Sequence, residues 1–363
     1  MIFRDDILAW YMQNKRNLPW RDTKDPYKIW VSEIILQQTR IDQGLPYYLK
    51  FIEAFPDVAA LALSSEQAVL NLWKGLGYYS RARNMHHTAL EIVQKHDGIF
   101  PKDYASLIKL KGIGTYTAGA IASICNNEVV PAIDGNVTRV ISRYFGVTDP
   151  VGSSSIIKKI KWISQQILPL ENTGDYNQAI MEYGAMVCTP SSPDCTACTL
   201  SELCYAYKNK LVALLPTRKK TKLKKQRFLT YLHIISPDGK IVMKQRTGKD
   251  IWKNLWDFPL IESDKLLDPR DISESMLLAD SKKGNGLNDN ISYKYLGMKD
   301  VLHVLTHQVL YVRFLTFKVT DPGNNFLPGN DYHLIDPGDN NVPVSQLIQN
   351  FLGANELFFG SDK

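Results

Sequence analysis

The sequence lacks an uninterrupted apolar run long enough to cross a membrane, since its small-residue stretch AGAIASIC is far too short. It also lacks a secretory leader pattern, because MIFRDDILAW places charged residues directly after the first apolar ones. Cysteines are few, five in 363 residues. These absences disfavour a membrane protein and a disulfide-stabilised secreted protein, so we expect a cytoplasmic protein without membrane contact.

Neither sign of charge dominates the composition. The 43 basic and 37 acidic residues leave a net charge of +6, which is compatible with nucleic-acid binding but common among soluble proteins. A length of 363 residues suits two domains, and an apolar content of 44% is enough for a packed core in each. No internal repeat is apparent.

Helical periodicity runs through the first part of the chain, where apolar residues recur at spacings of three and four in DILAWYMQ, YKIWVSEIILQQ and SIIKKIKWISQQIL. The basic stretch TRKKTKLKKQR at 217–227 is either a solvated linker or a linker that also contacts phosphate. Beyond it, RFLTYLHII-SPDG-KIVMKQR predicts a hairpin, LYVRFLTFKV a strand and SKKGNGLNDN a loop. We expect a mostly α-helical domain over 1–208, a linker over 209–227 and a mixed α/β module over 228–350.

Four of the five cysteines fall in one short segment with the spacing C-x6-C-x2-C-x5-C. Structural zinc sites usually have two separated C-x2-C pairs, and only one such pair is present. Closely spaced soft thiolates suit an iron–sulfur cluster, so the spacing favours iron–sulfur and leaves zinc open. The fifth, Cys125, is expected to be a buried small apolar residue. The candidate ligands are Cys188, Cys195, Cys198 and Cys204.

The stretch LKGIGTYTA at 110–118 places Gly112 and Gly114 directly before a predicted helix. Glycines allow a tight turn with outward-pointing N–H groups, and the start of a helix attracts anions. A nucleic-acid phosphate is the expected ligand, although G-x-G alone also fits an ordinary turn between two helices.

Two carboxylates are candidates for chemistry. Asp134 precedes an apolar-periodic helix in PAIDGNVTRVISRYF, where capping is its ordinary role, yet it would also lie near the hairpin. Glu33 shares a helix face with Ile29, Trp30 and Leu36. Such surroundings would raise its pKa and suit a general acid, whereas an exposed helical glutamate is the ordinary alternative.

These pieces together resemble the MutY family of adenine DNA glycosylases, in the helix–hairpin–helix superfamily. The resemblance covers residues 10–204 in unchanged order and extends, less strongly, from IVMKQR to NLWDFP. The matching stretches are WVSEIILQQTR, GLGYYSRARN, LKGIGTYTAGAIAS, IDGNVTRV and YNQAIMEYGAMVC, together with the cysteine spacing. It implies a helix–hairpin–helix glycosylase domain with a 4Fe–4S cluster loop at 188–204, followed by a Nudix-like lesion-recognition domain.

The resemblance also implies roles for single residues. Glu33 would protonate adenine at N7 and help to activate water, Asp134 would stabilise the positively charged sugar or bond to it transiently, and Asn136 would orient the base or the carboxylate. The flipped adenine would lie against Trp20, Arg21 and Gln178, since its glycosidic bond is unreachable inside a duplex. Residues expected near the partner 8-oxoguanine, or in the gap left in the base stack, are Gln38, Thr39, Leu76 and Tyr78.

Tyr116 determines the type of reaction that the resemblance implies. The related endonuclease III branch carries a lysine at this position, whose amine attacks C1′ and leads to strand cleavage. Tyrosine cannot form that Schiff base. The expected protein is a monomeric, monofunctional glycosylase that acts on duplex DNA and removes adenine opposite 8-oxoguanine or guanine.

The sequence departs from the family in three places. Lys111 replaces the usual proline before the first hairpin glycine. The usual Phe-Ser-His of the lesion-recognition loop is Leu305, Thr306 and His307 here, which loses the aromatic ring and leaves lesion contacts from Thr306 and His307 as an expectation. No G-x5-E-x7-R-E-U-x-E-E motif follows residue 228, so we expect no nucleotide hydrolysis.

Three other functions remain as alternatives. A thymine or uracil mismatch glycosylase of the same superfamily would usually lack the C-terminal module. A non-catalytic iron–sulfur sensor of DNA damage would not need Glu33 and Asp134, and both are present. A Nudix hydrolase with a helical extension is disfavoured by the missing motif.

Overall fold

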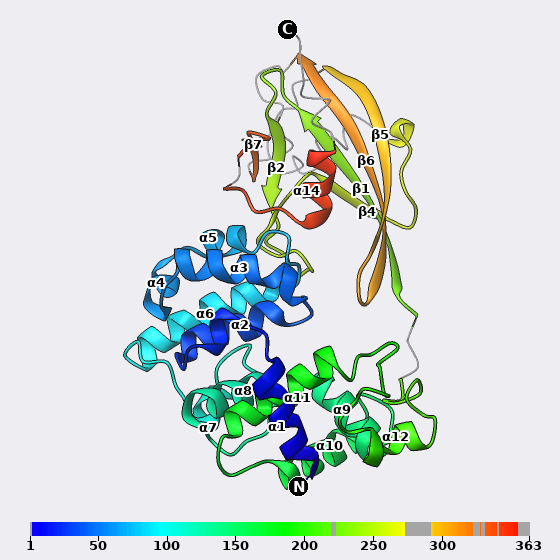
Figure 1. Ribbon diagram of the computed structural model, residues 1–363. Coiled ribbons are helices and arrows are strands. Elements are labelled where there is room, and N and C mark those ends of the chain that lie inside the picture. The colour runs from blue at the N-terminus through cyan, green and yellow to red at the C-terminus, as the bar shows by residue number, and fades with distance from the viewer. Residues whose placement is uncertain are drawn as a thin grey trace. The chain divides into compact units, whose positions relative to one another are not determined.

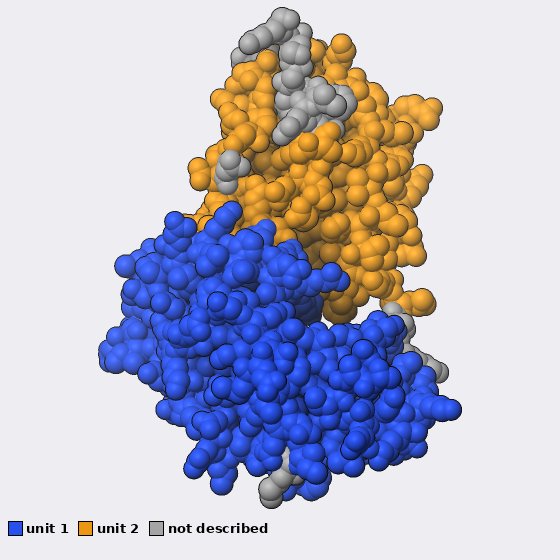
Figure 2. Space-filling view, in the orientation of Figure 1, with its two compact units in different colours: residues 1–64, 83–221 blue, residues 65–82, 222–363 orange. Residues whose placement is uncertain are grey.

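The chain divides into two compact units in the computed structural model, which describes residues 2–218, 223–272, 292–321, 327, 331–339 and 341–354. The helical unit comprises Met1–Ser64 and Arg83–Thr221 (Figure 2). The sheet unit comprises Ser65–Ala82 and Lys222–Lys363. The short segment 65–82, expected in the helical domain, therefore groups with the C-terminal module. Within the described residues, no helix is long and apolar enough to cross a membrane.

The helical unit consists of α-helices and short 3-10 turns, as predicted for residues 1–208 (Figure 1). Its helices are α1 (Ile2–Asn14), α2 (Pro26–Leu36), α3 (Ile41–Ala54), α4 (Val58–Leu63), α6 (Ser80–Lys95, which begins in the sheet unit), α7 (Tyr104–Leu107), α8 (Thr115–Asn126), α9 (Gly135–Phe145), α10 (Ser154–Ile167), α11 (Thr173–Met186) and α12 (Tyr205–Lys208), with the turns η1 (Pro19–Arg21) and η2 (Ser201–Leu203).

Local sequence signals start the helices that matter for the site. Asp25 caps α2 by accepting a hydrogen bond from the Tyr27 N–H at 3.0 Å, and Pro26 occupies the first helical position. Asp134 caps α9 in the same way, and Gly146 ends it in a left-handed conformation. One apolar core joins α1 to α9, α10 and α11 through Phe3, Ile7, Tyr11 and their neighbours.

The sheet unit is built on one mixed sheet with the strand order β3-β2-β1-β6-β5. β1 and β6 run parallel in register from Lys225↔Gln308 to Ile235↔Lys318, and β5 pairs antiparallel with β6. The predicted hairpin is confirmed, since β1 pairs antiparallel with β2 around Ile235↔Ile241. The elements are α5 (Glu66–Leu72), β1 (Lys225–Ile235), β2 (Ile241–Gln245), β3 (Trp256–Asp257), β4 (Leu260–Ser263), η3 (Pro269–Asp271), β5 (Ser292–Val304), β6 (Gln308–Asp321), β7 (Tyr332–Ile335) and α14 (Gln346–Gly353).

Apolar side chains cover both faces of this sheet. The helix α14 lies on one face (Figure 1). Its Phe351 stacks on Phe314, with ring centroids 4.0 Å apart. A second cluster gathers Leu232, Ile234, Leu315 and their neighbours. The strand β1 begins at Lys225, within the segment expected to be linker, and the predicted loop at 281–290 lies outside the described residues.

Candidate active site

A cavity of about 370 Å³ in the helical unit gathers all of the predicted catalytic residues and some of the predicted substrate-binding residues. Its walls come from η1, α2, the start of α8, the start of α9 and one face of α11. Segments far apart in the sequence therefore meet at one place. The predicted residues that line it are Trp20, Arg21, Glu33, Thr39, Tyr116, Asp134, Asn136 and Gln178.

Glu33 lies on α2 with its carboxylate facing this cavity. The Tyr116 hydroxyl donates a hydrogen bond to Glu33 Oε2, and Met181 Sδ lies 3.4 Å from the same hydroxyl. Burial raises the pKa of Glu33 to about 7, against the opposing effect of the Tyr116 hydrogen bond. The expectation from the helix face is confirmed, because Ile29 and Trp30 are buried beside it. Near neutral pH, the carboxyl group is therefore partly protonated and can transfer a proton.

Asp134 caps α9, as its sequence position suggested, and also lines the cavity. Its Oδ1 accepts the Val137 N–H at 2.7 Å as a helix cap, and its Oδ2 accepts the Asn136 side-chain N–H at 2.7 Å. Burial raises the pKa of Asp134, while these bonds favour its charged form. Asn136 is itself held by Arg139, whose Nη2 donates to the Asn136 side-chain oxygen at 2.8 Å. The amide orientation is therefore fixed toward the carboxylate.

The two carboxylates have different surroundings. Glu33 has one hydrogen-bond donor, the Tyr116 hydroxyl, while Asp134 accepts two strong hydrogen bonds. Burial raises the pKa of both acids, but Asp134 has two donors that favour its charged form where Glu33 has one. Glu33 therefore suits a general acid and Asp134 suits a charge-stabilising group. A glycosidic bond placed between them could be broken by protonation of the leaving base on one side and stabilisation of the sugar cation on the other.

Sequence reasoning missed four charged residues in the wall, which are Arg16, Arg40, Asp42 and Glu182. Glu182 lies on α11, four residues after Gln178, and its side chain is only 2% exposed. It forms ion pairs with Arg16 and Arg21, at 2.6 and 2.5 Å. The spacing of residues 178, 181, 182 and 185, which all line the cavity, marks one helix face. That spacing would have pointed to Glu182, but nothing in the sequence would have identified its partners.

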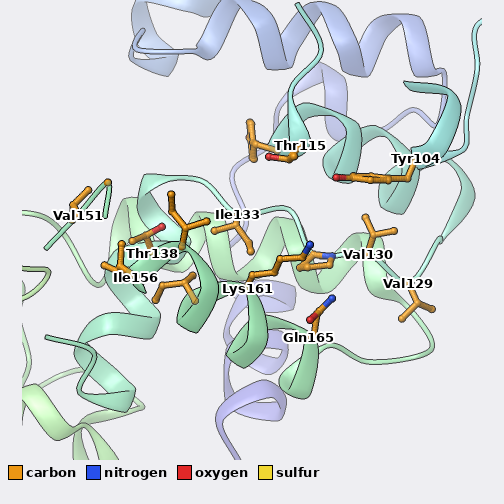
Figure 3. Close-up of a pocket in the computed structure, with 15 residues that line it drawn as sticks. Tyr104, Thr115, Val129, Val130, Ile133, Thr138, Val151, Ile156, Lys161 and Gln165 are labelled. Atoms are coloured by element: carbon orange, nitrogen blue, oxygen red, sulfur yellow. The ribbon is translucent and has the colours of Figure 1, made fainter. Parts of the chain in front are cut away.

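A second cavity has a volume of about 620 Å³ and shares Tyr116 with the first. Its wall consists largely of valines and isoleucines, among them Val130, Ile133 and Ile156, with Lys161 and Gln165 from α10 (Figure 3). None of the residues that line it is an aspartate or a glutamate. Although this cavity is larger, its described lining lacks the carboxylates that the first cavity contains.

The hairpin before α8 forms a tight turn around Gly112. Its φ of +79° lies in the left-handed region, and a Cβ there would come within 2.8 Å of the Asn84 Cβ. Gly114 has an ordinary φ of −88° and caps α8 without a side-chain hydrogen bond to the first-turn amides. Thr88 donates to the Lys111 carbonyl at 2.6 Å and braces the turn. The first-turn N–H groups of α8 therefore donate no hydrogen bond to a capping side chain, and donors of this kind suit an anion.

The four predicted ligand cysteines line one small cavity of about 30 Å³. Burial and the neighbouring cysteines raise the pKa of Cys195. Arg143 Nη1 donates to Cys188 Sγ at 3.4 Å, and the Tyr183 hydroxyl lies 3.1 Å from Cys198 Sγ. Within the described residues, no group of three or more His, Cys, Asp or Glu side chains is arranged around a single metal ion. The four thiols therefore lie near one another, but they are not close enough together to bind one shared metal ion.

Five of the predicted substrate-binding residues do not line the cavity. Gln38 follows α2 with a φ of +58° and is exposed. Leu76 and Tyr78 belong to the sheet unit, as do Thr306 and His307 in the exposed turn between β5 and β6. Within that unit, the Tyr78 hydroxyl and the Thr306 hydroxyl are hydrogen-bonded at 2.5 Å. No sequence pattern pairs these two residues.

Comparisons with known proteins match both units. The HhH-GPD superfamily base excision DNA repair protein family matches residues 31–165, and the NUDIX domain family matches residues 230–352. The solved structure of a thermostable thymine-DNA glycosylase has a TM-score of 0.52 at 26% identity, covering 57% of this chain and 96% of that one. An endonuclease III–DNA complex aligns with a TM-score of 0.50 at 20% identity, which supports the helical fold alone.

Curated relatives extend over nearly the whole chain. An adenine DNA glycosylase of Buchnera aphidicola subsp. Schizaphis graminum is 41% identical over 262 residues, covering 71% of this chain and 74% of that protein. Another, of Buchnera aphidicola subsp. Acyrthosiphon pisum, is 34% identical over 356 residues, covering 96% and 97%. Unlike the thymine-DNA glycosylase structure, this second relative matches the sheet unit as well as the helical unit.

Proposed function

This chain belongs to the adenine DNA glycosylase family and excises adenine from DNA in base excision repair; from that premise, we propose that its substrate is adenine paired with 8-oxoguanine or guanine in duplex DNA. The observation that carries the proposal is the pair of carboxylates in one cavity, Glu33 with a pKa of about 7 and Asp134 bound by two donors. Thymine or uracil opposite guanine is the alternative substrate.

We assign the protonation step to Glu33. Adenine extruded from the duplex would enter the cavity between Trp20 and the α11 face, where Gln178 can hydrogen-bond its edge. Protonated Glu33 then transfers its proton to N7, which makes the base a better leaving group. Tyr116 stabilises the carboxylate that remains, since its hydroxyl donates to Oε2. This proton transfer is worth roughly 10²- to 10⁴-fold in rate.

Asp134 is the group that we assign to the sugar. When the C1′–N9 bond breaks, its electron pair leaves with the base and positive charge develops at C1′. A carboxylate held by Asn136 and by the Val137 N–H opposes that charge without reorganising. Water, deprotonated by the Glu33 carboxylate, then adds to C1′. Because the hairpin carries Tyr116 rather than an amine, we propose that the product is an abasic site in an intact strand.

The duplex would be gripped at the hairpin and recognised by the sheet unit. We propose that Gly112 and Gly114 allow a phosphate to approach the first-turn N–H groups of α8. Gln38, Thr39, Leu76 and Tyr78 would contact the partner base or fill the gap in the stack. The hydrogen-bonded hydroxyls of Tyr78 and Thr306, next to His307, would distinguish 8-oxoguanine from guanine at its C8 and N7 edge.

The thiols of Cys188, Cys195, Cys198 and Cys204 are proposed to hold a 4Fe–4S cluster. In such a cluster each thiolate binds a different iron, so the sulfurs are spaced more widely than around one zinc ion. The four cysteines line one small cavity, but among the described residues they are not grouped closely enough to hold a single metal ion. This arrangement is compatible with the wider spacing of a cluster. The cluster would tie η2 and α12 to α11. Protein prepared without oxygen should contain about four irons per chain, and stoichiometric zinc without iron would contradict the assignment.

A panel of duplexes tests the proposed substrate. Base release is measured under single-turnover conditions for adenine opposite 8-oxoguanine, adenine opposite guanine, thymine opposite guanine, and thymine glycol. We expect release from the two adenine duplexes only, faster opposite 8-oxoguanine, and strands that stay intact until alkali is added. Release of thymine at a comparable rate would support the alternative substrate.

The lesion contact has its own test in the full-length chain. Thr306→Val with His307→Ala should lower the preference for 8-oxoguanine over guanine by roughly 5- to 150-fold, because a direct base contact contributes about 1–3 kcal/mol to discrimination. Thr320→Val, which removes an exposed hydroxyl on β6, is the control. Binding to both duplexes is compared at one salt concentration. An unchanged preference would shift lesion recognition to Thr39, Leu76 and Tyr78.

A further inference from the structure

The ion triad of Arg16, Arg21 and the buried Glu182 has no role in the chemistry assigned so far. Each guanidinium makes two bonds to the one carboxylate, through Nε and Nη2 of Arg16 and through Nη1 and Nη2 of Arg21, at distances of 2.5 to 2.9 Å. The Arg16 main-chain N–H also donates to Glu182 Oε1 at 3.2 Å. All three residues line the cavity that contains Glu33 and Asp134.

The triad also fixes the backbone between α1 and η1. Arg21 Nη1 donates to the Arg16 carbonyl at 2.9 Å, and the Arg21 guanidinium lies over the Tyr11 ring, 5.4 Å from its centroid. Glu182 thereby joins the α1–η1 loop to α11 across the wall of the cavity. With four of their donor groups held by one carboxylate, the two guanidiniums can present only their remaining N–H groups to the cavity.

We propose that Glu182 is a positioning residue of the adenine pocket: it locks Arg16 and Arg21 side by side in the wall and cancels one of their two positive charges. This inference rests on the proposed function, since it concerns the same cavity and the proton held by Glu33. Burial alone would raise the pKa of Glu182, but its bonds to Arg16 and Arg21 bring that pKa to about 2, so the residue stays charged at every working pH.

The charge count explains why the third member matters. Two guanidiniums and one carboxylate leave a net charge of +1 in this wall, and loss of the Glu182 charge would leave +2. Arg21 already lowers the pKa of Glu33 slightly, after the larger effects of burial, Tyr116 and Asp134. A second uncompensated cation would lower it further and remove the proton that adenine needs. At an effective dielectric of about 20, a unit charge roughly 10 Å away shifts a carboxyl pKa by about one unit.

Other charged and titratable groups face Glu33 and stay constant in this comparison. Tyr116 faces it from α8 and Asp134 from the cap of α9, while Arg40 and Asp42 line the cavity at the start of α3. No histidine lines this cavity. A change of the triad charge should therefore move the high-pH limb of the rate profile, where Glu33 loses its proton, and should move it in a direction set by the sign of the charge removed.

The test measures single-turnover adenine release from pH 5 to 9 in four proteins. Glu182→Gln should move the high-pH limb down by about one unit, so that its rate falls roughly tenfold below wild type at pH 8 but less than twofold at pH 6. Arg16→Met should move the limb up, because the wall becomes neutral. The double variant Glu182→Gln with Arg16→Met restores a net charge of +1 and should return the limb close to the wild-type position.

Two controls separate positioning from general stability. Glu171→Gln makes the same charge change at an exposed site that does not line the cavity, and its profile should match wild type. Glu182→Asp keeps the charge but is too short to bridge both guanidiniums, so its limb should stay in place while its rate constant falls. Thermal unfolding of each variant is measured, and reactions are run well below the lowest midpoint.

The outcomes are distinct. If the limb of Glu182→Gln coincides with wild type, or the double variant does not return toward it, Glu182 is a structural ion-pair partner only. If Glu182→Gln does not fold, the upward shift of Arg16→Met still decides the question, because Arg16 is 34% exposed and tolerates replacement. Failure of the wild type to release adenine would overturn the proposed function instead.

Discussion

Removing the Tyr116 hydroxyl should make adenine release persist to higher pH, although the enzyme becomes slower. This hydroxyl donates to Glu33, and that bond favours the carboxylate over the protonated acid. In Tyr116→Phe the ring still fills the space, but the carboxylate loses its donor. The pKa of Glu33, about 7 in the wild type, must therefore rise.

The size of the shift follows from the type of bond. A hydrogen bond to a charged group contributes about 1.5–3 kcal/mol, and one pKa unit corresponds to about 1.4 kcal/mol. A shift of one to two units would result if the site stayed dry. Water that enters the space left by the hydroxyl would reduce the effect, so we expect the Glu33 pKa to rise to about 8.

The sign of the effect on the rate comes from the form of Glu33 that reacts. Protonated Glu33 is the proton donor, so activity is present below its pKa and lost as the pH rises through it. The high-pH limb of Tyr116→Phe should therefore lie about one unit above that of the wild type. The plateau rate should fall, because the carboxylate formed by proton transfer is no longer stabilised.

Single-turnover release of adenine from pH 5 to 9 measures both effects. Tyr104→Phe is the matched control, since it removes a hydroxyl from the neighbouring cavity, which lacks carboxylates (Figure 3). A limb that stays in place or moves to lower pH in Tyr116→Phe would refute the idea that this hydroxyl acts on Glu33. An unchanged plateau would refute its part in proton transfer.

Three further results are expected. Glu33→Gln should lose at least ~10²-fold in single-turnover rate with unchanged duplex binding in a titration, whereas wild-type turnover would make Glu33 a helix-surface residue. Tyr116→Lys should form a complex with DNA that borohydride traps, and a lysine-linked complex already abundant in the wild type would contradict the monofunctional assignment. Gly112→Ala should destabilise the fold by about 1–3 kcal/mol, because its φ is left-handed and Asn84 occupies the space. Gly114→Ala should melt like wild type, since nothing lies within 4 Å of its Cβ position, and equal melting points for the two variants would exclude the proposed turn strain.

The sequence was sufficient to predict a residue's environment where that environment comes from neighbouring residues of the same segment. Glu33 could be placed on a buried face because Ile29 and Trp30 lie one turn away, and Asp134 could be placed as a cap from its position before an apolar-periodic run. The proximity of the four cysteines was predictable for the same reason, since they lie in one short segment. For Glu33, a spacing of three or four residues along one helix determines the neighbours.

Contacts between distant segments were not predictable. Arg16 and Glu182 are separated by 166 positions, and their ion pair depends on how α11 packs beside η1. The close approach of α11 to the start of α9, where a Cβ on Gly184 would come within 2.7 Å of Asn136, has no local signal either. The parallel pairing of β1 with β6 joins strands more than 80 residues apart, and alternation within a strand does not identify its partner.

The membership of residues 65–82 in the sheet unit has a consequence for synthesis on the ribosome. This segment bonds to Asn254 through Glu66, to Asn341 through Asn71 and to Val344 through Tyr79, all within that unit. Residues 83–221 are translated in between, which takes roughly 7 to 28 s at about 5–20 residues per second. Throughout that interval the segment waits without these partners. Co-translational folding therefore cannot be completed in chain order, and an early stretch of the chain becomes native only when the last strands and α14 have emerged.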